Sequence, residues 1–430
     1  MTSSDDKSHN VKVQARLSHP VVHASGPTEV FLRVDVTGLG ETGKRPPLDL
    51  AVVLDRSGSM QGEKLRYAKK AVDTLIDRLL PADHMALVAY DDVVDTVFAR
   101  RKVDDALVMK TKAALIETGG CTNLSGGLVE GLQQLGQDKG ELRRVFLLSD
   151  GLANQGVTDP DALADLVQQG VKKGGGVSTF GVGVDFNEEL LRTLADVGGG
   201  NYYYIASPDD IPGIFMEELG ELGDVVAQNV LLDFVPQGVE ILGVLGFNSP
   251  NLPAQAGDVR AGAVRSIMLA LAVPPSKEGE VVLGEVICRW TALDDALVPR
   301  EEHITVSAVS SSDLKRFQEA VDEEVLRAAQ LQLVADENQA ASRAARAGDE
   351  AAFHAHLEKA RTSLELLGDV DDPGVREQRY LTNELLSGGS ERLLRDLDLQ
   401  KRTHTSQYNR SRGRTSKWFE DEHNRTSDNK

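Results

Sequence analysis

The spacing of apolar residues differs between sections of the chain, and in the longest section it is typical of an α/β domain. Residues 48–54 form a nearly continuous apolar run, which is typical of a strand buried on both faces of a parallel sheet. Further apolar runs, at 84–90, 144–148 and 177–184, are separated by segments of helical period as far as residue 222. This alternation predicts a Rossmann-like domain with a mostly parallel sheet and helices on both faces.

Strand-like segments with a period of two flank this domain on both sides. Residues 11–17 and 30–36 alternate between apolar and polar side chains before it, and five similar segments follow residue 223. Those five segments are 227–234, 239–244, 264–273, 281–290 and 303–309. We therefore expect a β-sandwich, formed by residues 11–46 and 223–311, with the α/β domain (residues 47–222) inserted between its parts. A separate N-terminal hairpin is the alternative.

The remaining chain divides into a helical region and two polar ends. Apolar residues recur at nearly 3.5-residue spacing from residue 314 to about residue 346, and a second helix is predicted over 351–367. We expect a helical region over 312–400. Residues 1–10 and 401–430 are polar and nearly without aliphatic side chains, so both are predicted to be disordered. The predicted fold class is thus multidomain: α/β plus β-sandwich, followed by helices.

Composition and charge argue against several classes of function and indicate a cellular compartment. The net charge of −20 argues against general nucleic-acid binding. No window approaches the roughly 18 apolar residues of a membrane helix, and the start of the chain lacks the apolar core of a signal peptide. The only cysteines, Cys121 and Cys288, lie far apart without a CxxC pattern, which argues against a zinc site or disulfide scaffold. We expect a cytoplasmic protein, with unconventional export as the alternative.

Oxygen-bearing side chains follow three of the predicted elements. The run 48–54 ends in Asp55, Ser57 and Ser59, with Gly58 allowing a tight turn between the two serines. Thr122 lies in a Gly-Gly-Cys-Thr-Asn loop, and Asp150 follows the run 144–148 after one serine. Loops at the carboxyl ends of strands form the ligand sites of open α/β sheets. Oxygen ligands of this kind suit Mg²⁺, although Mn²⁺ and Ca²⁺ share them.

The order and spacing of these five residues resemble the metal-ion-dependent adhesion site of von Willebrand factor type A domains, including those of integrins. The resemblance covers about residues 48–222, and Leu-Leu-Ser-Asp-Gly at 147–151 is similar to the segment of bacterial members. The flanking strands and C-terminal helices resemble bacterial multidomain proteins of the family. The resemblance implies that Asp55, Ser57, Ser59, Thr122 and Asp150 hold a divalent cation. It also implies that the hydroxyls bind directly and that at least one acidic residue acts through water.

The implied function is non-enzymatic. One coordination position would stay open for an Asp or Glu carboxylate of a protein partner, and the last helix of the domain, 208–222, would shift between states. An accessory subunit of a larger assembly, such as an AAA+ ATPase system, with a mainly structural metal, is the second hypothesis. The chain has no Walker motif, so any ATPase would be a separate protein. A metal-dependent phosphohydrolase is disfavoured, because no general base or second metal site accompanies Asp55.

Two further features have alternative interpretations. Cys121, beside Thr122, is expected to be a buried small hydrophobe rather than a redox switch. Residues 401–417 contain six basic and no acidic side chains, and Trp418 and Phe419 follow. This tail is either solvated or a docking segment, Lys401 to Phe419, that uses the aromatic pair as an anchor for an acidic surface or anionic lipid.

Overall fold

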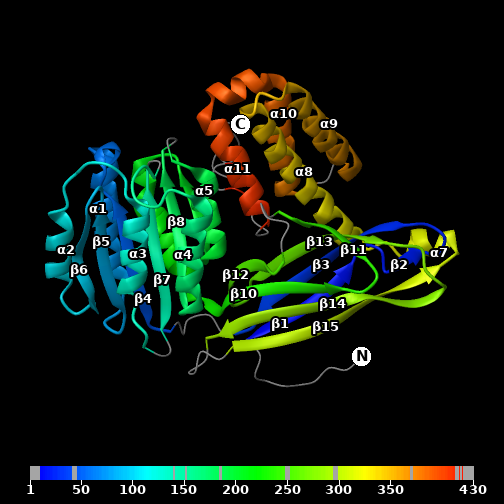
Figure 1. Ribbon diagram of the computed structural model, residues 1–430, viewed down its shortest axis with the longest axis horizontal. Helices are drawn as coiled ribbons and strands as arrows, with labels where there is room; N and C mark the ends of the chain where they lie inside the picture. Colours follow the sequence, from blue (N-terminus) through cyan, green and yellow to red (C-terminus); the bar gives the residue numbers. More distant parts are fainter. Residues whose placement is uncertain are drawn as a thin grey trace.

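The computed structural model describes residues 10–40, 46–138, 141–150, 153–183, 186–246, 252–293, 299–368, 371–411, 416 and 419. An α/β part and a β-sandwich lie side by side, and the C-terminal helices stand over the sandwich (Figure 1). The last of these helices, α11 (Leu397–Ser411), reaches the α/β part. The predicted order of α/β, β and helical regions is thereby confirmed.

The α/β part is built on a six-stranded sheet with the strand order β6-β5-β4-β7-β8-β9. Its strands are β4 (Leu48–Asp55), β5 (His84–Tyr90), β6 (Val94–Lys102), β7 (Leu142–Ser149), β8 (Gly175–Val182) and β9 (Gly199–Ile205). All neighbouring strands are parallel except β5 and β6. The two central strands, β4 and β7, are buried along their whole length, as their continuous apolar runs predict.

Helices cover both faces of this sheet. They are α1 (Glu63–Arg78), α2 (Ala106–Ala114), α3 (Leu124–Gln134), α4 (Pro160–Lys172), α5 (Glu188–Val197) and α6 (Ile211–Gly223), with 3-10 turns η1 (Gly58–Met60) and η2 (Pro208–Asp210). Successive side chains of a strand point to opposite faces. Val52 of β4 accordingly packs in the core shared with α1, α2 and α6, whereas Val53 packs in the core of α3, α4 and α5.

The sandwich is formed by strands from both sides of the α/β part. One sheet has the order β1-β3-β13-β11 and the other β12-β10-β14-β15-β2. The strands are β1 (Val11–Leu17), β2 (Val21–His23), β3 (Thr28–Gly38), β10 (Val225–Pro236), β11 (Glu240–Leu245), β12 (Ala254–Arg260), β13 (Val264–Val273), β14 (Gly279–Ala292) and β15 (Pro299–Ser311). β3 pairs along its length with β13. The predicted insertion is therefore confirmed, and the alternative of a separate N-terminal hairpin is wrong.

The C-terminal helices form a small bundle around α8 (Glu323–Arg346). Its other members are α9 (Glu350–Leu367), α10 (Pro373–Arg395) and α11, whereas the short helix α7 (Leu314–Glu319) packs against β2 and β15 of the sandwich. α8 contacts α9, α10 and α11 within the bundle and β3 and β11 of the sandwich. Among the described residues, no helix combines the length and apolar character that crossing a bilayer requires.

The tail corrects a prediction, because residues 401–411 belong to α11 instead of being disordered. The helix is poor in aliphatic residues, yet most of it is buried, and its polar side chains have partners inside the molecule. Lys401 Nζ donates to the carbonyl of Phe186 at 2.8 Å and forms an ion pair with Glu188. The hydroxyl of Tyr408 accepts the backbone N–H of Tyr202 at 2.8 Å. The low hydrophobicity of residues 401–411 therefore reflects a buried polar interface within the chain and not disorder.

The described residues of the predicted docking segment accordingly pack against other parts of the same chain. Lys401 is 3% exposed, and Phe419, 8% exposed, lies with its ring centroid 6.1 Å from that of Tyr380 in α10. These residues are thus covered by other parts of the same chain. Trp418, together with residues 1–9, 412–415, 417 and 420–430, lies outside the described residues.

The ion pairs of Glu188 generate a prediction about pH and the docking of α11. Burial raises the pKa of Glu188, but the charges of Lys401 and Arg346 outweigh burial and lower that pKa from 4.5 to about 2. A lowered folded-state pKa stabilises the fold above the unfolded pKa, and this contribution is lost as the pH falls from about 5 to about 2. We expect Glu188→Gln to lower the free energy of unfolding at neutral pH by about 3 kcal/mol and to remove this pH dependence.

Urea unfolding and hydrogen exchange of the α11 amides, each at neutral and acid pH, would measure both effects. The exposed neighbour Glu189 on the same helix provides the matched control, Glu189→Gln. Equal stability of the two variants would show that this ion pair does not hold α11.

Candidate metal centre

The loop after β4 is fixed by hydrogen bonds to a buried carboxylate. Asp55, the last residue of β4, is fully buried. Its Oδ1 accepts the backbone N–H of Ser57 at 2.8 Å, and its Oδ2 accepts the hydroxyls of Ser149 at 2.9 Å and Tyr90 at 3.4 Å. The strand end is thus tied to the following turn and to both neighbouring strands. Gly58 then begins η1, which places Ser59 at the surface.

Asp150 lies beside this loop because β7 is the parallel neighbour of β4. The register pairs Leu54 with Leu148, so both strands end at the same edge of the sheet. Asp150 is fully buried, and its Oδ1 accepts the hydroxyl of Ser59 at 2.7 Å. Ser59 Oγ also lies 3.2 Å from Ser57 Oγ. Hydrogen bonds therefore connect both serines and Asp150, across 91 residues of sequence in the case of Ser59.

The loop that carries Thr122 packs against the serine loop through its backbone. Gly119 donates its N–H to the carbonyl of Arg56 at 2.7 Å, and Gly58 donates to the carbonyl of Gly120 at 3.0 Å. Thr122 is 4% exposed, and its backbone N–H donates to Asn154 Oδ1 at 2.9 Å. The structure thus places all five predicted ligand residues on loops that meet at one edge of the sheet.

Electrostatics at this edge favour a cation. Burial raises the pKa of Asp55, hydrogen bonds from Ser57 and Ser149 oppose this, and the charge of Asp150 raises the pKa further. The raised pKa expresses mainly the cost of holding the Asp55 carboxylate away from water, to which the nearby charge of Asp150 adds. All five side chains offer oxygen, the ligand that Mg²⁺ prefers. The donor set therefore fits a hard divalent cation.

Sequence reasoning missed the residues that support this edge. Tyr90 ends β5, and burial raises its pKa well above the ordinary value, so its hydroxyl stays protonated and can donate. Asp91 follows it and accepts the backbone N–H groups of Val93 at 2.9 Å and Gly120 at 3.2 Å. Lys64 Nζ donates to Asp150 Oδ2 at 2.6 Å. Tyr90 is the last residue of a predicted strand and Asp91 follows it. Residues at such a position could have been predicted to take part in the site.

Cys121 differs from its prediction. Its side chain is exposed, whereas a buried hydrophobe was expected. Gly119 and Gly120 are exposed as well, so the Thr122 loop presents its tip to solvent while Thr122 itself points inward from the surface. The rim of the candidate centre is therefore accessible, although its carboxylates are buried.

A second group of candidate ligand atoms lies at the opposite edge of the sheet. His84, Asp138 and Glu141 offer atoms within 4.8 Å of one another. Arg100 already donates to Asp138 Oδ2 at 2.6 Å and to Glu141 Oε2 at 2.7 Å. The guanidinium thus already occupies an oxygen of each carboxylate in this cluster, and we assign no metal to it.

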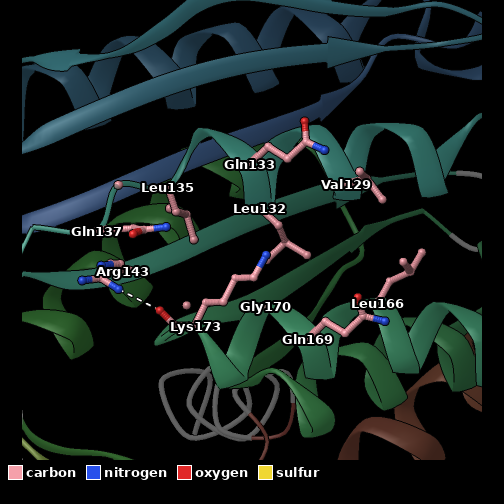
Figure 2. A pocket seen from close by; sticks show the side chains of 12 residues that line it. Val129, Leu132, Gln133, Leu135, Gln137, Arg143, Leu166, Gln169, Gly170 and Lys173 are labelled. Atoms are coloured by element: carbon pink, nitrogen blue, oxygen red, sulfur yellow. Dashed lines mark hydrogen bonds between the residues drawn. The ribbon is translucent and has the colours of Figure 1, made fainter.

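Figure 2 shows a groove of about 330 Å³ between α3 and α4. Leu132 and Leu166 line it from the two helices, and Arg143 Nη1 donates to the carbonyl of Lys173 at 2.8 Å near its end. Arg143 and Gly175 stand at the amino ends of β7 and β8. The groove is therefore separate from the candidate metal centre, which lies at the carboxyl ends of the strands.

The sequence profile of the von Willebrand factor type A domain family matches residues 49–217. The chain contains a von Willebrand factor type A domain. It is 28% identical over 264 residues to the uncharacterized protein YfbK of Escherichia coli K12 and 27% identical over 292 residues to the uncharacterized protein sll0103 of Synechocystis. The first alignment covers 57% of this chain and the second 64%. The chain spans about half (46%) of the length of YfbK and 69% of that of sll0103.

Two solved structures share more than the type A domain. A von Willebrand factor type A protein from Catenulispora acidiphila aligns with a TM-score of 0.69 at 20% identity, covering 88% of this chain and 91% of that one. The ArnB paralog VWA2 from Sulfolobus acidocaldarius aligns with a TM-score of 0.65 at 18% identity, covering 93% and 98%. At such coverage the likeness includes the sandwich and the helices, so the predicted fold is confirmed.

Asp91 generates a prediction about the loops of the centre. In Asp91→Ala the backbone N–H groups of Val93 and Gly120 lose their acceptor, which we expect to lower the free energy of unfolding by about 2 to 3 kcal/mol. The exposed neighbour provides the control Asp92→Ala, expected to stay within about 0.5 kcal/mol of the parent protein. Urea unfolding would compare the three proteins, and equal values for both variants would contradict the supporting role of Asp91.

Proposed function

We propose that this protein is a non-enzymatic interaction protein that binds an Asp or Glu side chain of a protein partner through a divalent cation, Mg²⁺. The ligands would be Asp55, Ser57, Ser59, Thr122 and Asp150. The observation that carries the proposal is the hydrogen-bonded convergence of Ser57, Ser59 and Asp150 beside the buried Asp55. It brings two neutral hydroxyls and two carboxylates to one surface loop cluster, against which the loop of Thr122 packs through its backbone.

The chemistry of this donor set supports recognition more than catalysis. Three of the five proposed ligands would be neutral hydroxyls, which supply oxygen without negative charge, so a bound cation would keep an electrophilic position for a further oxygen ligand. Ser59 and the loop tip at Gly119 and Gly120 are exposed, so a partner's carboxylate can approach. Among the described residues, no histidine is hydrogen-bonded to Ser57 or Ser59 to act as a general base.

The cytoplasmic location belongs to the same proposal. Cys288 is fully buried in the sandwich, where burial raises the pKa of its thiol to about 12, and Cys121 is exposed. Both are free cysteines, as expected in a reducing compartment.

The proposal predicts metal-dependent capture of a partner. We expect a partner in the native lysate to bind the full chain in Mg²⁺ and to be lost in EDTA. Asp55→Ala should weaken metal binding by more than the roughly 10- to 100-fold that loss of a supporting hydrogen bond costs at metal sites. This variant should therefore also lose the partner, whereas Asp92→Ala, which removes an exposed carboxylate near the same loops, should retain it.

Affinity capture, with circular dichroism to check folding, would measure these outcomes. A partner that binds equally in Mg²⁺, in EDTA and with Asp55→Ala would contradict the proposal. Such a result would favour the accessory-subunit hypothesis, in which the sandwich or the helices bind and the metal is structural.

A further inference from the structure

The side chain of Lys64 places a positive charge beside the candidate metal centre. It is the second residue of α1, and its Nζ donates to Asp150 Oδ2 at 2.6 Å. A Cβ added to Gly183, in the turn after β8, would lie 3.6 Å from this Nζ, so the side chain passes close to that turn. Lys64 is 24% exposed, whereas Asp150 is fully buried. Its ammonium group therefore lies at the edge of the candidate centre, largely shielded from solvent.

This contact leaves Asp150 with both oxygens engaged. Oδ1 accepts the hydroxyl of Ser59, and Oδ2 accepts the ammonium of Lys64. The other cation of these loops, Arg56, pairs instead with Asp91 at 3.3 Å and Asp95 at 3.5 Å. Lys64 is thus the cationic side chain that, among the described contacts, acts directly on a predicted metal ligand.

Lys64 changes the net charge of the candidate centre by one unit. Asp55 and Asp150 contribute −2, and Lys64 contributes +1, so the centre carries −1 before a divalent cation binds and +1 afterwards. One carboxylate from a partner would then bring the total to zero. With the charge of Lys64 removed, the two aspartates alone would neutralise the cation, and a third carboxylate would add an uncompensated negative charge.

We propose that Lys64 shifts affinity from the divalent cation to the partner's carboxylate, because its positive charge weakens binding of the cation and strengthens binding of the carboxylate. The inference rests on the proposed function, since it concerns the same site. Coupling between two ligands is reciprocal, so the carboxylate tightens cation binding by the factor by which the cation tightens carboxylate binding. Lys64 thereby acts as a residue that tunes specificity for acidic partners.

The test uses the full chain, Mn²⁺ as the metal and acetate as the carboxylate probe. Mn²⁺ binding is measured by electron paramagnetic resonance in sodium acetate and in sodium chloride of the same concentration. Lys64→Met removes the charge and the hydrogen bond, whereas Lys64→Gln keeps a donor for Asp150 without the charge. Lys64→Arg keeps the charge. Lys70→Met removes the same charge from an exposed position of the same helix.

We expect Lys64→Met and Lys64→Gln to bind Mn²⁺ at least about tenfold more tightly than the parent in chloride, because a unit charge beside a partly buried cation has an effect of that size or more. Acetate should tighten Mn²⁺ binding in the parent, Lys64→Arg and Lys70→Met, and much less in the two neutral Lys64 variants. Unchanged or weaker binding by both neutral variants would overturn the inference. An equal gain in Lys70→Met would also overturn it, since overall charge would then explain the effect.

Asp55→Ala separates this inference from the proposed function. If it binds Mn²⁺ like the parent, the metal lies elsewhere, and the proposed centre fails together with the role of Lys64. If it abolishes binding while the neutral Lys64 variants match the parent, the centre stands and only the inference about Lys64 fails.

Discussion

Two carboxylates end neighbouring parallel strands at one edge of the sheet, Asp55 on β4 and Asp150 after β7, and both are fully buried. Like charges brought together away from water are unfavourable unless other groups compensate for them. The polar surroundings follow from this constraint, because the hydroxyls of Ser59 and Ser149 and the ammonium of Lys64 all donate to these two residues. A divalent cation at the proposed metal centre would complete the same compensation.

Buried charge also connects the metal edge to the other parts of the molecule. Arg144, near the amino end of β7, forms a buried ion pair with Asp258 of β12, so the strand that leads to Asp150 is anchored to the sandwich. Glu218 of α6 is fully buried and accepts hydrogen bonds from Ser178, from Asn201 at 2.7 Å and from Tyr203 at 2.8 Å. A shift of α6 of the kind that the family resemblance implies would have to break these bonds. Any such movement would therefore involve strands β8 and β9 as well.

The sequence predicted most of the fold because hydrophobic period and burial agree along β4, β7 and the paired strands of the sandwich. It failed where polar residues are buried. β12 was missed because its segment, Ala254–Arg260, contains one large aliphatic residue and depends on Asp258 for its ion pair. α11 was missed for the same reason, since Lys401 and Tyr408 are secured by polar contacts. The contact between Lys64 and Asp150 spans 86 residues, and no local pattern could have indicated it.

The overall charge of −20 raises the question of how the proposed acidic partner could approach this chain. At physiological ionic strength the screening length is about 8 Å, so most of the acidic surface is screened from a partner that approaches one loop cluster. Within that distance the charges of the centre act together with those of the adjoining loops, where Arg56 pairs with Asp91. Counted over Asp55, Asp150 and Lys64 alone, the balance would be positive only with both Lys64 and a bound divalent cation, and it would be negative without the cation. Long-range repulsion and short-range attraction would then act together, so that only a carboxylate placed directly at the loop edge is held, and only in the presence of the metal.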